Sequence, residues 1–427
     1  MERRKGIITG LVACVILLLV ILTGWMVWQQ KAGQQSRTYM EVPASADAKT
    51  ESAQVKRESM GEKLAERESV KDGAAAAEQE GLESGANLEE QTNVESEASQ
   101  ANQGGMTNQG GMGVNTAGVT AEDIVLLFAG DVYLSDHVLN AYQKAGGITG
   151  VLDEGIRQEI EAADIFMVNQ EFPFTDRGTA AADKQYTFRL APEKVSMFHE
   201  MGIDIVTLAN NHILDFGEVG LLDSCETLDK AGIQYVGAGE NLERARQLET
   251  MTVGDKTIGF LGTSRVYMAA SWAAGASHPG VFSTYDPALP LEAIKAAKEQ
   301  CDYLVVYVHW GVERETTPKD YQKTMGRQYI DAGADLVVGS HPHVLQEMEI
   351  YNGKPIVYSL GNFVFGSSIP KTALLKVELS GDGGWEHGVE SQAVGGESQA
   401  VEEESQPAVK VTMIPCTSSA GYTRLAQ

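Results

Sequence analysis

Gly333-Ala334-Asp335-Leu336-Val337-Val338-Gly339-Ser340-His341-Pro342-His343-Val344 is the stretch that decides the fold. Its central apolar run, 336–338, is of the kind that a buried parallel strand makes. The Gly-Ser pair that ends the run lets the backbone turn sharply. His341 and His343 follow at once, and Pro342 between them favours a bent path on which both imidazoles reach one centre. A histidine pair at the end of a buried strand indicates a metal site.

The composition narrows the function classes. The 427 residues carry a formal net charge of -26, which excludes nucleic acid as a partner because phosphate binding needs a basic face. Much of the acidity lies in low-complexity segments, so it bears on solubility more than on the fold. The four cysteines are far apart and predict no disulfide framework, although a single bridge among them stays open.

The N-terminus predicts a membrane anchor. Residues 1–5 form a basic tip, and residues 6–28 are an apolar run without charge, long enough to span a bilayer. No small-x-small cleavage site follows, so we expect an uncleaved single-pass segment in the cell membrane, with a cleaved signal peptide as the alternative. Because the basic tip stays on the cytoplasmic side, the rest of the chain is expected to be extracytoplasmic.

Two low-complexity segments frame the part expected to fold. Residues 29–120 lack hydrophobic periodicity and are rich in Glu, Ser, Ala, Gln and Gly, which predicts a disordered tether. Residues 121–427 form the expected folded domain. Within it the acidic segment 381–408 repeats Glu-Ser-Gln and is expected to be an insertion in a hairpin between strands at 374–379 and 409–414. The alternative is that the domain ends near Ser380.

Apolar strand runs alternate with helical patterns from residue 122 onward. Strands are expected at 124–129, 165–168, 205–209, 235–236, 256–261, 303–308, 336–338 and 354–360. Helices are expected at 152–163, 192–201, 218–231, 291–299 and 318–332, the last with Pro318 in its first turn. This alternation predicts an α/β domain with a largely parallel sheet at its core.

Polar side chains follow these strands where each one ends. They are Asp131, Glu171, Asn211, His309, His341 and His343. Because ligands of α/β sheets bind beyond the carboxyl ends of the strands, we expect these residues to form one cluster. Carboxylates, an amide oxygen and imidazoles suit first-row divalent metals. The set is large enough for a two-metal site in which one carboxylate bridges the ions.

Six segments in order carry a family resemblance. They are Phe128-Ala129-Gly130-Asp131, Asn169-Gln170-Glu171, Leu208-Ala209-Asn210-Asn211-His212 with Asp215 and Gly217, His309-Trp310-Gly311 with Glu313, the opening stretch, and Tyr358-Ser359-Leu360-Gly361-Asn362-Phe363. Over roughly residues 122–380 the chain resembles the calcineurin-like metallophosphoesterase superfamily, and more closely the CapA family of poly-γ-glutamate capsule synthesis proteins. The resemblance implies a layered α/β metallophosphoesterase-like fold and one or two divalent ions, with manganese, iron and zinc left open.

The resemblance also implies residue roles. Asp131, Asn211, His309, His341 and His343 would be metal ligands, and Glu171 would stand where the superfamily has a bridging aspartate. His212 would assist the leaving group, with Asp215 orienting it. One departure matters, because Asp131-Val132-Tyr133 stands where the superfamily has Asp-x-His. Tyr133, Asp136 and His137 lie nearby, and the sequence leaves open whether one of them substitutes for the missing histidine.

Four further residues are predicted to contact substrate. Arg189 is suited to an anionic group, with a structural salt bridge as its alternative. Trp310 is expected to shape a pocket beside His309. Glu313 and Asn362 are expected at the site, with a surface charge and a turn residue as the respective alternatives.

The implied role is synthesis, export or surface attachment of poly-γ-glutamate or a related anionic envelope polymer, with polymer synthase membrane subunits as partners. Two hypotheses stand side by side. In the first the chain is a metal-dependent hydrolase, in which metal-activated water attacks a phosphoester, amide or ester. In the second it is a non-catalytic metal- or polymer-binding accessory subunit, a hypothesis that the missing histidine favours.

Overall fold

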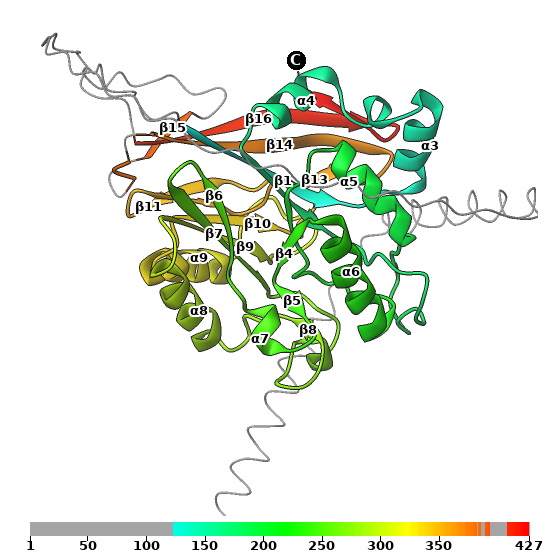
Figure 1. Ribbon diagram of the computed structural model, residues 1–427, viewed down its shortest axis with the longest axis horizontal. Coiled ribbons are helices and arrows are strands. Elements are labelled where there is room, and N and C mark those ends of the chain that lie inside the picture. Colours follow the sequence, from blue (N-terminus) through cyan, green and yellow to red (C-terminus); the bar gives the residue numbers. More distant parts are fainter. Residues whose placement is uncertain (1–122, 382, 386–388, 393–407, 427) are drawn as a thin grey trace, which may run out of the picture. The chain divides into compact units, whose positions relative to one another are not determined.

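The computed structural model describes residues 123–381, 383–385, 389–392 and 408–426, all within one compact unit, Gly110–Gln427 (Figure 1). The predicted basic tip, the anchor at 6–28, the tether at 29–120 and most of the predicted insertion lie outside the described residues. Across the described ranges, no helix has both the length and the apolarity needed to cross a membrane.

The first of two large sheets is built around β1 (Ile124–Val132). β1 pairs in parallel with β2 (Ile165–Gln170) on one side and antiparallel with β14 (Ser368–Leu379) on the other. The order is β15-β16-β14-β1-β2-β3-β4, with β13 paired to the end of β1 and β17 paired to β16. The other strands are β3 (Ile205–Thr207), β4 (Gln234–Val236), β13 (Asn362–Val364), β15 (Val389–Gln392), β16 (Val409–Ser419) and β17 (Tyr422–Leu425).

The second sheet has a parallel centre and antiparallel edges. Its order is β11-β12-β10-β9-β7-β6. The strands are β6 (Glu249–Val253), β7 (Lys256–Ser264), β9 (Tyr303–His309), β10 (Leu336–Ser340), β11 (Met348–Tyr351) and β12 (Lys354–Val357). The neighbours among β7, β9, β10 and β12 are parallel, whereas β6 and β11 are antiparallel to theirs. A separate small pair is formed by β5 (Ala238–Gly239) and β8 (Gly280–Val281).

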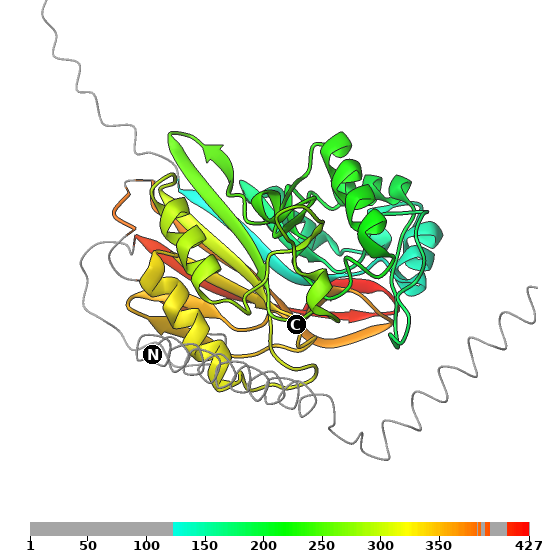
Figure 2. The same cartoon turned by 90° about the horizontal axis from the view of Figure 1, so that it is seen from below.

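The two sheets face each other (Figure 1), and helices cover their outer faces (Figure 1 and Figure 2). In β1, Leu126 and Phe128 pack in the cluster between the sheets, whereas Leu127 packs with the helices of the first sheet. This alternation is the two-residue period of a strand, and burial of both faces explains the continuous apolar run.

The helices are α3 (Asp136–Ala145), α4 (Glu154–Glu161), α5 (Ser196–Glu200), α6 (Gly217–Ala231), α7 (Leu242–Ala245), α8 (Ala288–Lys298) and α9 (Asp320–Ala332), with 3-10 turns η1 (Ile148–Gly150), η2 (Pro192–Val195) and η3 (Ala270–Trp272).

Several sequence expectations need correction. The α/β class is confirmed, but the core is two mixed sheets rather than one largely parallel sheet, because the long β14 and β16 run antiparallel beside β1. β16 and β17 complete the first sheet, so the alternative that the domain ends near Ser380 is wrong. Pro318 is not in a helical turn, since α9 begins at Asp320 with Lys319 as its N-cap. The helices α3 and α7 and the strands β5, β6, β8, β11, β13 and β17 were not expected, and β15 is a strand within the segment 381–408 that was predicted to be a low-complexity insertion.

Candidate metal centre

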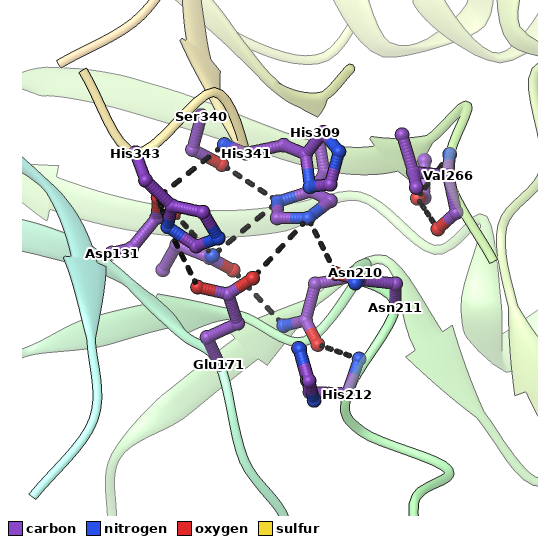
Figure 3. Close-up of polar contacts among 12 residues, drawn as sticks. Asp131, Glu171, Asn210, Asn211, His212, Val266, His309, Ser340, His341 and His343 are labelled. Carbon is purple, nitrogen blue, oxygen red and sulfur yellow. Dashed lines mark hydrogen bonds and ion pairs between the residues drawn. The ribbon is translucent and has the colours of Figure 1, made fainter. Parts of the chain in front are cut away.

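The six predicted metal ligands gather where the carboxyl ends of strands from both sheets meet (Figure 3). The first sheet supplies Asp131 near the end of β1, Glu171 directly after β2, and Asn211 after β3. The second sheet supplies His309 at the end of β9, and His341 and His343 after β10. Because the two sheets pack face to face, residues that are far apart in the sequence lie close together at this point.

Glu171 lies between two groups of ligand atoms. One group is Glu171, His309 and His341, and the other is Asp131, Glu171 and His343; within each, the ligand atoms lie within 4.8 Å of one another. Glu171 Oε1 is 3.6 Å from His309 Nε2, and Glu171 Oε2 is 3.8 Å from His343 Nδ1. Ligand atoms held about 2.1 Å from one ion lie roughly 3–3.5 Å apart. The spacing therefore fits two ions bridged by the Glu171 carboxylate.

Asn211 belongs with the first of these groups. Its side-chain Oδ1 is 2.8 Å from His309 Nε2, the same nitrogen that faces Glu171. The other nitrogen of His309, Nδ1, is 2.9 Å from Ser340 Oγ. A partner on the far nitrogen fixes the orientation of a metal-binding imidazole. The ring thus presents Nε2 to the point where Asn211 and Glu171 converge.

The charges and unpaired atoms of the cluster fit a cation. Both oxygens of the fully buried Glu171 carboxylate, and Nδ1 of the buried His341, have no hydrogen-bond partner among the described residues. A buried carboxylate without partners is costly. Burial, and then the neighbouring Asp131 carboxylate, raise the pKa of Glu171 well above its ordinary value. A divalent ion would supply the missing partner to each of these atoms.

The imidazoles differ in the charge that their surroundings favour. Burial, and then neighbouring imidazoles, lower the pKa values of His309 and His341 well below the ordinary range, which keeps both rings neutral as metal ligands must be. Burial also acts to lower the pKa of His343, but the Glu171 and Asp131 carboxylates outweigh it and raise the pKa to about 10. The second group therefore attracts a positive charge beside its two carboxylates.

The His-Pro-His segment has an unusual backbone. His341 has φ 96° and His343 has φ 57°, in the left-handed region that costs a non-glycine residue about 1–3 kcal/mol. This path turns His341 toward His309, with ring centroids 4.7 Å apart, and His343 toward Asp131, with Nδ1 3.2 Å from Oδ2. The bend expected at Pro342 is therefore present, and it sends the two imidazoles to different ligand groups.

A buried polar network that the sequence reasoning did not assign supports the ligands. Asn169 Nδ2 donates to Asp131 Oδ1 at 2.8 Å, and Asn169 Oδ1 accepts from Asn210 Nδ2 at 3.0 Å. Asn210 Oδ1 in turn accepts from the backbone N–H of His212 at 3.0 Å. Asn169 and Asn210 are fully buried. Their position within the quoted motifs, next to predicted ligands, was the available sequence signal.

His212 and Asp215 form a second cluster beside the ligands. His212 Nδ1 is 2.7 Å from Asp215 Oδ2, which also accepts the backbone N–H of Phe188 at 2.7 Å. The Phe188 ring stacks on the imidazole with centroids 4.2 Å apart. Burial lowers the pKa of His212, opposed by the hydrogen bond to Asp215. Asp215 thus orients His212, and Nε2 forms no hydrogen bond within the described part of the chain.

Lys184 is a functional candidate that the sequence reasoning missed. Its ammonium contacts Asp215, the backbone oxygen of Asn211, and His212 Nδ1, the last at 3.0 Å. Burial lowers the pKa of Lys184, opposed by Asp215. The lysine lies in a loop without periodicity between β2 and α5, so no sequence pattern marks it.

Replacing Lys184 with methionine should destabilise the protein by about 3 kcal/mol, because the buried Asp215 carboxylate loses its cation. Urea unfolding in the presence of a chelator measures this change. The matched control is Lys230→Met, which removes an exposed pair with Glu226 and should change stability by less than about 0.5 kcal/mol. Equal losses for the two variants would contradict the structural role of Lys184.

Two of the four predicted substrate contacts, Trp310 and Asn362, form contacts within the protein. Trp310 is fully buried in the cluster under α8 and α9, where its indole N–H donates to the Tyr358 backbone oxygen at 2.9 Å. Because side chains alternate along a strand, Trp310 points away from the face that presents His309. Asn362 makes a contact within the cluster instead, with Oδ1 2.8 Å from His343 Nδ1.

Arg189 and Glu313 stay accessible. Arg189 is exposed, its guanidinium lies 4.4 Å from the centre of the Phe216 ring, and it forms no ion pair among the described residues. The alternative of a structural salt bridge is therefore not supported. Glu313 is exposed and close enough to raise the pKa values of Glu171 and Lys184. Both residues can meet a ligand that approaches from solvent.

A surface cavity and the three described cysteines lie outside the metal centre. A cavity of about 710 Å³ lies between η2–α5 and α6 and is lined by His199, Arg177 and Asp223 among others, but by none of the predicted site residues. Cys225, Cys301 and Cys416 are free thiols, so the described residues contain no disulfide bridge.

Comparisons with known proteins place the chain in a family. Residues 125–367 match the family model described as "Bacterial capsule synthesis protein PGA_cap". The chain is 35% identical over 265 residues to the "PGA biosynthesis protein CapA" of Bacillus subtilis, covering 60% of this chain and 68% of that protein. It is 31% identical over 272 residues to the "Capsule biosynthesis protein CapA" of Bacillus anthracis, covering 61% of this chain and 65% of that protein.

A further relative and a solved structure are more limited matches. A "Probable polyglutamine synthesis accessory protein" of Mycobacterium tuberculosis is 37% identical over 217 residues, covering 48% of this chain and 57% of that protein. The structure of Haemophilus influenzae NAD nucleotidase overlaps 62% of this chain and 54% of its own at 13% identity, with a TM-score of 0.39, which is too distant to carry an argument. The family model and the relatives above 30% identity agree, and this chain belongs to the bacterial capsule synthesis protein family.

Proposed function

We propose that the chain is a metal-dependent hydrolase that acts during synthesis or surface attachment of a polyglutamate-type capsular polymer. The observation that carries the proposal is Glu171, a fully buried carboxylate with two unpaired oxygens, each facing a different group of ligand atoms. Bound ions would supply Lewis acidity and a water of lowered pKa at this point.

The surrounding residues would bind and orient the reactants. Asp131, Asn211 and the three histidines would hold the ions, and the bridging Glu171 would fix their separation. His212, held through Nδ1 by Asp215, would present Nε2 to the leaving group. In its imidazolium form, with Nδ1–H donated to Asp215, it would give the Nε2 proton to the leaving group and become neutral, which is the role of a general acid. Lys184 would hold the Asp215 side chain in place.

The substrate class is inferred from family and charge. The Bacillus relatives are named for PGA and capsule biosynthesis, which favours an anionic polymer. The net charge of -26 opposes such a substrate, but much of that charge lies outside the centre. Divalent cations bound at the centre would make the electrostatic potential there positive. The exposed Arg189 guanidinium would pair with a carboxylate of the polymer.

The test is turnover by the full-length protein in detergent, first stripped of metal and then reloaded with manganese, zinc or iron. Phosphodiesters, carboxylic esters and poly-γ-glutamate serve as substrates. The proposal expects turnover of at least one class that is lost on chelation and regained with metal. Equal rates in the stripped and reloaded protein would contradict it.

A non-catalytic role is the second candidate, favoured by Tyr133 standing where the superfamily has a ligand histidine. In this role the domain would bind metal or polymer as an accessory of a membrane synthase complex. The two candidates make different predictions for His212. An accessory role requires the folded domain but no proton transfer by His212. Polymer production in cells that carry a His212 variant separates them.

We also propose that residues 6–28 anchor the chain, with the folded domain on the extracytoplasmic side. The basis is the uncharged apolar run behind a basic tip. Deleting residues 6–28 should move the protein from the membrane fraction to the soluble fraction and abolish polymer production. Protease added outside intact cells should reach the folded domain of the undeleted chain, and full protection would contradict this orientation.

A further inference from the structure

The second ligand group, Asp131–Glu171–His343, lacks the histidine that the superfamily resemblance leads one to expect at position 133. The structure shows what Tyr133 does instead. Its ring stacks on Phe188 with centroids 4.2 Å apart, and it meets the edge of Phe365 with centroids 5.6 Å apart. Phe188 in turn stacks on His212. Tyr133 therefore belongs to an aromatic cluster with Phe188 and Phe365, and Phe188 of this cluster packs on His212.

The other two residues left open by the sequence point elsewhere. Asp136 and His137 lie in the first turn of α3, and both are exposed. His343 Nδ1 has a different neighbour, Asn362 Oδ1 at 2.8 Å. The same nitrogen lies 3.2 Å from Asp131 Oδ2 and 3.8 Å from Glu171 Oε2. Asn362 Oδ1 is thus a third oxygen beside His343 Nδ1, next to the Asp131 and Glu171 carboxylates of the second ligand group.

Backbone pairing delivers Asn362 to this point. β13 runs parallel to β1, and Asn362 stands in register with Asp131. The backbone N–H of Asp131 donates to the Gly361 oxygen at 2.9 Å. A Cβ at Gly130 would lie 1.8 Å from that oxygen, so the close approach requires glycine there. The position of Asn362 is therefore fixed by the sheet and does not depend on a free loop.

We propose that Asn362 Oδ1 completes the ligand set of the ion at Asp131, in place of the histidine replaced by Tyr133; this rests on the proposed metal centre. An amide oxygen is a neutral hard ligand of the same kind as Asn211. The Asp131 site then has three oxygens and one imidazole, whereas the other has two imidazoles with Glu171 and Asn211. Because hard oxygen ligands favour manganese and imidazoles favour zinc or iron, the two sites should differ in metal preference.

The test uses a thiolate as a reporter at position 362. The full-length protein carrying Asn362→Cys is loaded with cobalt, and a cysteine bound to cobalt gives a sulfur-to-metal charge-transfer band in the near ultraviolet. A residue that only orients His343 gives no such band. The wild type is the control, since its described cysteines, Cys225, Cys301 and Cys416, lie outside the cluster.

Manganese titrations of Asn362→Ala and Tyr133→Phe complete the experiment. We expect the wild type and Tyr133→Phe to bind two ions alike, and Asn362→Ala to lose about 10- to 100-fold in affinity for one of them. Unchanged affinities in Asn362→Ala, or no charge-transfer band in an Asn362→Cys protein that binds two cobalt ions, would overturn the assignment alone. A wild type that takes up no divalent ion would overturn the metal centre and the proposed hydrolase as well.

Discussion

Replacing Glu171 with glutamine should empty the metal centre while leaving the protein folded. Glu171 contributes to both ligand groups. The loss of its charge should therefore lower the affinity for both ions by about 100-fold or more. Stability without metal should not fall, because the substitution removes the charge of a buried carboxylate that has no hydrogen-bond partner and lies beside the Asp131 carboxylate. Metal content by mass spectrometry and urea unfolding in a chelator measure the two effects on the full-length protein.

The matched control for this prediction is Glu313→Gln. Glu313 is also near the centre, but it is exposed, so its neutralisation should leave two ions bound. If Glu171→Gln retained both ions, the bridging role would be wrong. If the Glu171→Gln variant unfolded in the absence of metal, the Glu171 carboxylate would stabilise the metal-free fold, which contradicts the prediction.

Replacing His212 with glutamine should lower kcat by about 10²- to 10⁴-fold, the range that a general acid contributes. Metal content and KM should stay near the wild-type values, because His212 belongs to neither ligand group. The His212 ring is held by Asp215 and Phe188, and glutamine keeps a side chain of similar reach. Steady-state turnover of the metal-loaded protein gives the split between kcat and KM.

His199→Gln is the control for the His212 variant. His199 lines the separate cavity beside α5 and α6, so its replacement should leave kcat unchanged. A His212 variant with wild-type turnover would contradict the acid role. A variant that also sustains normal polymer production in cells would favour the accessory role instead.

The sequence predicted most strands of the core but not their division into two sheets. β1 and β9 are buried on both faces, and a continuous apolar run does not tell which sheet a strand joins. The antiparallel partners β14 and β16 are far from β1 in sequence, and their pairing depends on contacts across the whole domain. Short strands such as β13 carry too few residues for a periodic signal.

The ligand cluster was easier to predict than the residues around it. Asp131, Glu171 and His309 each stand at the end of a strand run, and strand ends converge. Trp310 follows His309 directly, so the two-residue alternation turns its side chain away from the ligand cluster and into the core. Lys184 could not have been found, since it reaches Asp215 from an irregular loop. Asn362 was expected at the site, but its place beside Asp131 follows only from the register between β1 and β13.

The central claim is that Glu171 bridges two divalent ions. The most direct measurement titrates the metal-free, full-length protein with manganese and records electron paramagnetic resonance spectra at each step. Two ions per chain, with an exchange-coupled signal that appears as the second one binds and that is lost in Glu171→Gln, are the predicted result. A single ion, or two ions whose signals stay uncoupled, would contradict the claim.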